Sequence, residues 1–123
     1  MDGGLVGIHN LVGTLIVVAY LALTVVNGLR LRGGDFSWAR PLSFAAAALL
    51  LIQYVLGFVL LSQGSRNATS HYLLAFLAIL TVGLEHGYAN SRPERRARAS
   101  AALLATGLTL LLVVAAYAIG SAR

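Results

Sequence analysis

Four long apolar stretches alternate with short polar links along the chain. The apolar runs cover residues 5–29, 41–62, 71–89 and 99–119. Each is long enough to cross the hydrocarbon core of a bilayer, which takes about 20 residues of helix. Backbone polar groups find no water inside a membrane, so the runs must form helices that satisfy their own hydrogen bonds. The pattern predicts an all-α membrane protein with a single four-helix transmembrane domain over residues 1–123.

The links between these runs contain residues that favour turns and helix ends. Two of them, over residues 63–70 and 90–98, are rich in Ser, Asn and Arg. Pro41 is well placed at a helix start, and Thr69 or Ser70 can cap the third helix. Because links this short make each helix antiparallel to the next, we expect an antiparallel bundle.

Composition supports the membrane assignment. Of the 123 residues, 59% are hydrophobic and 11% are charged, whereas a soluble domain carries about 25% charged residues. The net charge of +5 comes from arginines in short links, a placement typical of membrane topology and not of a nucleic-acid surface. We therefore expect the lipid bilayer and other membrane subunits as partners, and no nucleic acid. The absence of cysteine from the sequence excludes disulfides, thiolate metal sites and cysteine nucleophiles.

The distribution of arginine between the links predicts the orientation in the membrane. The first link holds Arg30, Arg32 and Arg40, the third holds four arginines, and the second holds only Arg66. Basic residues collect on the cytoplasmic side, so both termini are expected outside, although Arg123 opposes this. Arginine without lysine, with abundant Ala, Leu and Gly, indicates a GC-rich bacterial genome. The expected location is the inner, cytoplasmic membrane of a bacterium.

Two histidines fall at the same end of different predicted helices. His9 lies about one turn inside the first helix, and His71 begins the third, so the topology puts both near the outer face. His86 follows His71 by fifteen residues, about 22 Å along a helix, and cannot share a metal with it. Two imidazoles facing each other across a bundle are the ligand set of a b-type haem. His9 and His71 are therefore candidate iron ligands; the alternative is two histidines in the membrane interface.

Small residues near these histidines supply the room that a porphyrin needs. Gly13 follows the first histidine by four residues and shares its helix face. Ala75 follows the second histidine by four, and Gly57 lies four residues after Gln53 on the helix between. Gln53 is expected to contact a neighbouring helix or the cofactor. Small residues are also common in membrane helices because they allow close packing, which is the alternative interpretation.

Further candidates among the polar residues inside the predicted spans are Tyr20, Asn27, Glu85 and His86. Tyr20 and Asn27 continue the face of the first helix that carries His9, and we expect them to pack inward and bond to a neighbouring helix. Glu85 and His86 suggest a proton entry, a quinone contact or a single-histidine pigment ligand, while pairing with the arginines of the third link is the favoured interpretation. No serine–histidine–aspartate set, carboxylate pair or phosphate loop is visible in the sequence, which favours a non-catalytic electron-transfer or accessory subunit.

Three short segments carry a family resemblance. They are His9-Asn10-Leu11, Gln53-Tyr54-Val55-Leu56-Gly57 and Ser70-His71-Tyr72. Together they resemble one four-helix half of the haem A synthase family, whose members are built as a duplicated four-helix bundle. The resemblance implies that His9 and His71 hold a haem near the outer face, with Gln53, Leu56 and Gly57 on the helix between. Asn10 replaces the family's usual Arg, Val6 replaces an acid implicated in catalysis, and only one half is present, so the resemblance implies haem binding more than haem A synthesis.

The leading hypothesis is a small membrane cytochrome b that holds one haem b between His9 and His71 and passes electrons within a larger respiratory or photosynthetic complex. One alternative is a structural subunit without a cofactor. Another is an accessory protein with a chlorophyll-type pigment on His86 or His9. The last is a haem-modifying enzyme related to haem A synthase.

Overall fold

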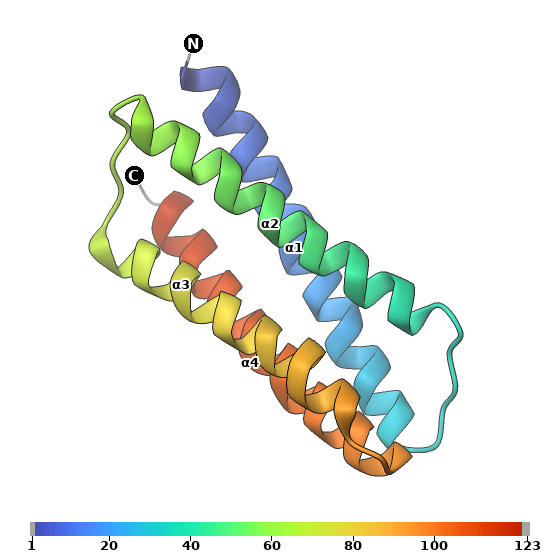
Figure 1. Cartoon of the computed structure of the whole chain (residues 1–123). Helices are drawn as coiled ribbons and strands as arrows, with labels where there is room; N and C mark the ends of the chain where they lie inside the picture. Colours follow the sequence, from blue (N-terminus) through green and yellow to red (C-terminus); the bar gives the residue numbers. More distant parts are fainter. Residues whose placement is uncertain (1, 122–123) are drawn as a thin grey trace.

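Four long helices in up-and-down order make up nearly all of the protein. The computed structural model describes residues 2–121, so Arg123 lies outside the described residues. The helices are α1 (Asp2–Leu31), α2 (Ala39–Ser62), α3 (Thr69–Gly83) and α4 (Arg95–Ser121), and the third span continues through a π-helical turn, η1 (Leu84–Tyr88), and a 3-10 turn, η2 (Ala89–Ser91). All four spans are long and apolar enough to cross a membrane. This confirms the predicted four-helix bundle of a multi-pass membrane protein (Figure 1).

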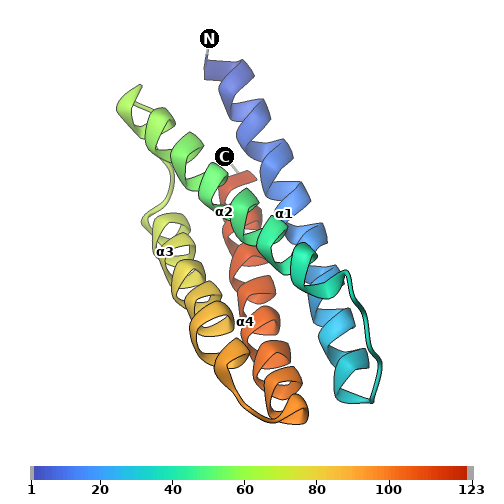
Figure 2. The same ribbon diagram turned by 45° about the vertical axis from the view of Figure 1, so that its right-hand side comes forward.

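The two ends of the bundle differ in chemistry. The described ends of the chain and the α2–α3 link lie at one end, while the α1–α2 and α3–α4 links lie at the other (Figures 1 and 2). The first end carries His9 and His71 and is called the histidine end. The other is called the arginine end because seven arginines gather there: Arg30, Arg32, Arg40, Arg92, Arg95, Arg96 and Arg98.

The helices extend beyond the apolar runs that predicted them. α4 already begins at Arg95, because arginine is a good helix former and its long side chain reaches water from a helix end. α2 begins at Ala39, so Pro41 falls in the first turn, where a missing N–H breaks no helical bond. The predicted cap of α3 is wrong. Ala68 is the N-cap, no side chain caps the helix, and Thr69 is already helical.

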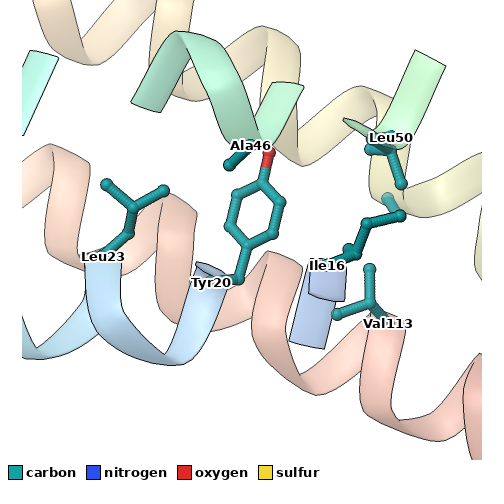
Figure 3. Packing of buried hydrophobic residues seen from close by; sticks show 7 residues of the cluster. Ile16, Tyr20, Leu23, Ala46, Leu50 and Val113 are labelled. Carbon is teal, nitrogen blue, oxygen red and sulfur yellow. The ribbon is translucent and has the colours of Figure 1, made fainter. Parts of the chain in front are cut away.

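The centre of the bundle is formed where α4 packs against both α1 and α3. From α1, Tyr20 and Ile16 are almost fully buried, and Figure 3 shows Tyr20 projecting toward Ala46 of α2. Small residues in α4 allow the backbones to approach closely, which is how helices associate in lipid. The small buried residues of α4 are Ala99, Ala102, Ala105, Thr106, Thr109 and Ala116.

The sequence predicts that Tyr20 and Asn27 pack inward and bond to a neighbouring helix, and Asn27 does both. Asn27 donates to Thr106 Oγ1 at 3.2 Å and accepts from Arg30 at 2.7 Å, so it bridges α1 and α4. This confirms the expectation for Asn27. Tyr20 packs inward as expected, but its hydroxyl finds no hydrogen-bond partner within the described part of the chain. The hydroxyl lies beside Ala46, which offers only an apolar side chain (Figure 3).

α2 and α3 diverge from each other. α2 packs against α1, and α3 packs against α4, but the backbones of α2 and α3 make almost no contact. Large apolar side chains of both helices, such as Ile52, Leu73 and Leu80, are exposed, and in a bilayer they face lipid. The divergence leaves space inside the bundle, and this space contains the candidate site.

Candidate functional site

A cavity of about 1060 Å³ opens at the histidine end and is lined by residues of all four helices. Pockets for small molecules and cofactors measure about 300–1,000 Å³, so this cavity is large enough for a macrocycle. The six residues that the sequence singled out as a cofactor site all line it: His9, Gly13, Gln53, Gly57, His71 and Ala75. The structure thus brings the six together, while their role in binding a cofactor stays a prediction.

His9 of α1 and His71 of α3 both line this cavity and lie close together. Their ring centres are 6.4 Å apart and the ring planes are inclined by 56°. An imidazole nitrogen lies about 2.0 Å from a metal that it ligates, so two imidazoles sharing one metal have ring centres roughly 6 Å apart. Ordinary aromatic pairs span a similar range of distances. Aromatic rings that only pack together leave little space around them. The large cavity beside His9 and His71 therefore favours a ligand pair.

The hydrogen bond of His71 fixes its tautomer. Its Nδ1 lies 2.8 Å from the backbone carbonyl oxygen of Ala116 in α4. A carbonyl only accepts, so Nδ1 must carry the proton and donate, which leaves Nε2 with a free lone pair. Histidines that ligate metals commonly donate their other N–H to a backbone carbonyl in this way. The neutral ring of His71 is therefore held in the tautomer that ligation through Nε2 requires.

Gln53 of α2 holds the segment around His9. Its amide nitrogen donates to the backbone carbonyl of His9 at 2.8 Å and lies 3.5 Å from His9 Nδ1, so the expected interhelical contact is confirmed. The amide oxygen of Gln53 is buried and lacks a hydrogen-bond partner among residues 2–121. Such an orphaned acceptor at the wall of a cavity is a place where a bound group or ordered water is expected.

Glycines clear the space next to both imidazoles. A Cβ on Gly57 would lie 3.6 Å from His9 Nε2, and one on Gly120 would lie only 3.0 Å from His71 Cε1 and Nδ1. Gly13 is also buried, but the nearest atoms to a Cβ there belong to Gln53 and to the ring of Tyr117, each at 3.1 Å. Gly57 and Gly120 therefore make room for the two imidazole rings, whereas Gly13 makes room for the side chains of Gln53 and Tyr117.

Ala75 contributes its backbone to the cavity wall. Its carbonyl accepts a hydrogen bond from the hydroxyl of Tyr54 in α2, and both residues line the cavity. The bond connects α2 and α3 where their backbones diverge. The side chain of Tyr54 thus reaches from α2 to the backbone of α3 at Ala75.

The α4 residues at this site were not predicted from the sequence. Ala116, Tyr117 and Gly120 line the cavity, and two of them contact His71 directly. Gly120 follows Ala116 by four residues and Tyr117 by three, which places it near both on the helix surface, but such spacing is ordinary in a membrane helix. Only the rotation of α4 against α3 shows that this face meets His71. Arg66 also lines the cavity, although the sequence indicated only a role in topology.

A second polar site lies at the arginine end. Glu85 accepts a hydrogen bond from Ser43 of α2 and lies 3.6 Å from His86 Nε2. The predicted pairing of Glu85 and His86 with arginines of the third link is wrong, because those arginines donate mainly to backbone carbonyls. The bonds run from Arg95 to Gly34, from Arg96 to Leu31, and from Arg98 to Arg92 and Pro93.

Comparison of the chain with protein-family models, curated proteins and solved structures gives no match. The fold and the site define the class: a four-helix membrane protein in which histidines from the first and third helices lie close together in the lining of a large cavity.

Proposed function

We propose that the protein is a small membrane cytochrome b that holds one b-type haem between His9 and His71 and takes part in electron transfer. One observation carries the proposal: the two imidazoles lie 6.4 Å apart, centre to centre, across a cavity of about 1060 Å³. Bis-imidazole ligation in a helical bundle is a standard way to hold haem. Haem held there supplies one-electron chemistry through its ferric and ferrous states.

Each residue around the cavity has a distinct task in this proposal. His9 and His71 would hold the haem iron, and the Ala116 carbonyl orients His71 through the bond to Nδ1. Gln53 positions His9 through its backbone carbonyl. The guanidinium of Arg66 at the wall of the cavity suits the haem carboxylates, because arginine binds carboxylates with charge-assisted bonds.

The ligand set favours electron transfer over substrate chemistry. With His9 and His71 both holding the iron, the haem would supply electron transfer and not a binding position for oxygen or a substrate. The resemblance to haem A synthase supports haem binding at His9 and His71, while Val6, in place of the family's catalytic acid, counts against synthesis. The protein's contribution is ligation, burial and tuning of the potential.

We also infer the setting of this site. The bilayer is the immediate environment of the four apolar spans, and arginine placement favours a cytoplasmic arginine end with the histidine end outside. A bundle of 123 residues offers little surface for two redox partners, which favours a subunit of a larger respiratory or photosynthetic complex in a bacterial inner membrane.

The orientation can be tested because the sequence lacks cysteine. Ser37→Cys marks an exposed residue at the arginine end, and Ala68→Cys marks one at the histidine end. In intact spheroplasts, a membrane-impermeant thiol reagent should label Ala68→Cys and spare Ser37→Cys. Labelling of Ser37→Cys alone would reverse the proposed orientation.

The haem proposal is tested by the absorption spectrum of protein purified from cells supplied with haem. Sharp bands of low-spin, six-coordinate haem are expected in the reduced state. His9→Ala and His71→Ala should each abolish that spectrum, since one imidazole leaves the iron open, whereas His86→Ala should keep it. An unaltered low-spin spectrum in His9→Ala would refute the ligand pair, far-red bands would indicate a pigment instead, and a colourless protein would indicate a subunit without a cofactor.

A further inference from the structure

The third span changes helix type near the arginine end. After α3, residues Leu84–Tyr88 form the π-helical turn η1, which carries Glu85 and His86. A π turn inserts an extra residue into a helix, and such turns occur frequently at functional sites. Glu85 is 3% exposed although it is an acid within a membrane span. Acidic residues there are costly and usually mark a functional group.

The carboxylate of Glu85 is only half satisfied. Its Oε2 accepts a hydrogen bond from Ser43 Oγ. Its Oε1 is buried, has no hydrogen-bond partner among the described residues, and lies 3.6 Å from His86 Nε2. That separation is too long for a hydrogen bond. The described residues therefore leave the hydrogen-bonding capacity of Oε1 unused.

A polar cavity connects this carboxylate with the arginine end. It measures about 410 Å³ and lies among the end of α1, the first link, the start of α2, the third span and the start of α4. One buried water needs a few tens of Å³ and two to four polar partners, so the cavity has room for several. Its polar and charged lining residues are Asn27, Arg30, Asp35, Arg40, Ser43, Glu85, Asn90 and Arg98.

The groups around Glu85 act on its charge in opposite directions. Burial favours the neutral acid, and nearby negative charge does the same, while positive charge and the Ser43 hydrogen bond favour the carboxylate. The surrounding titratable and charged groups come from every neighbouring element: Tyr20 and Arg30 of α1, Asp35 of the first link, Arg40 of α2, His86 of η1 and Arg98 of α4. These influences oppose one another, so the charge state of Glu85 is set by their balance.

We propose that Glu85 is a proton-exchange site served from the arginine end. Oε1 takes a proton from water in the cavity, which converts the carboxylate to the carboxylic acid, and returns it by the same route. Ser43 holds Oε2 so that Oε1 stays directed to the exchange, and Ser43 Oγ also lies 3.3 Å from His86 Nε2. The site lies at the opposite end of the bundle from His9 and His71, so it does not depend on haem binding.

Infrared difference spectroscopy on the full chain in lipid vesicles tests the proposal. A protonated carboxyl has a C=O stretch that a carboxylate lacks, so stepping the pH should produce and remove such a band. Glu85→Gln should abolish the band while keeping side-chain size and helix content. Glu94→Gln is the matched control, because Glu94 is exposed and does not line the cavity.

Two further observations complete the test. The band should shift in D₂O, because the proton exchanges with water. Ser43→Ala should keep the band but move its pH midpoint upward, because the hydroxyl that donates to the carboxylate is gone. A band that is absent at every pH at which the protein is folded would show that Glu85 stays ionised. A band that persists at every pH without shifting in D₂O would show that Glu85 stays protonated and does not exchange its proton with water. Either result overturns the proposal.

Discussion

Gly120 offers the sharpest test of how His71 is held. In Gly120→Ala, the new Cβ would stand 3.0 Å from Cε1 and Nδ1 of His71, closer than ordinary contact at 3.4–4 Å. The ring must therefore move by a few tenths of an ångström, on the side where Nδ1 donates to Ala116 at 2.8 Å. Loss of one such bond costs about 0.5–1.5 kcal/mol. We therefore expect haem binding to weaken roughly 2- to 12-fold.

The assay is haem titration of the apoprotein, with the low-spin spectrum as readout. Gly57→Ala is the matched control, because its Cβ would lie 3.6 Å from His9 Nε2, an ordinary contact. It should bind haem with nearly unchanged affinity, whereas the larger Gly57→Leu should lower occupancy in a folded protein. The contrary result is that Gly120→Ala binds haem as tightly as the parent while Gly57→Ala does not. That result would refute both the claim that Gly120 makes room for the His71 ring and the claim that the ring donates from Nδ1.

Three other substitutions probe single bonds in the bundle. Tyr20→Phe removes a buried hydroxyl that has no partner among residues 2–121, and should raise the free energy of unfolding by about 1 kcal/mol in detergent titration; a loss would indicate a bound water. Asn27→Ala leaves Arg30 without its 2.7 Å acceptor and should lower that free energy by about 2 kcal/mol. Gln53→Leu removes the 2.8 Å bond to the His9 carbonyl and should weaken haem binding about 2- to 12-fold, which equilibrium titration would measure; unchanged affinity would show that the bond does not position His9.

The four spans and the histidine pair could be predicted from the sequence because their signals are local. An apolar run of about 20 residues needs no knowledge of its neighbours to be recognised as a membrane helix. His9 and His71 could be paired because short links force antiparallel order, which puts the start of the first helix and the start of the third at one end. The structure shows the same arrangement, with the two rings 6.4 Å apart.

The rest of the site depends on how the helices rotate about their own axes. The contact of Ala116 and Gly120 with His71 follows from the register of α4 against α3, which many small residues along α4 would permit equally well. The absence of a partner for the Tyr20 hydroxyl depends on Ala46 being opposite it on α2 (Figure 3). Neither feature has a sequence signal.

The error at Glu85 has a specific cause. Its position beside the arginine-rich third link suggested an ion pair, on the assumption that the third span is an uninterrupted α-helix. The π turn over Leu84–Tyr88 changes the direction in which the following side chains point. Glu85 lies within this turn and accepts a hydrogen bond from Ser43 of α2, whereas the arginines donate to backbone carbonyls.

Both sites exist because α2 is joined to the third span by side chains rather than by backbone packing. Ser43 reaches Glu85 at the arginine end, and Tyr54 reaches the carbonyl of Ala75 nearer the histidine end. These two residues are eleven apart, about three helical turns, so they share one face of α2. Each bond bridges the divergence of the two helices beside one of the two cavities. Close packing of α2 on α3 would close both cavities, and the bonds of Ser43 and Tyr54 join the helices across the space that the two proposed sites require.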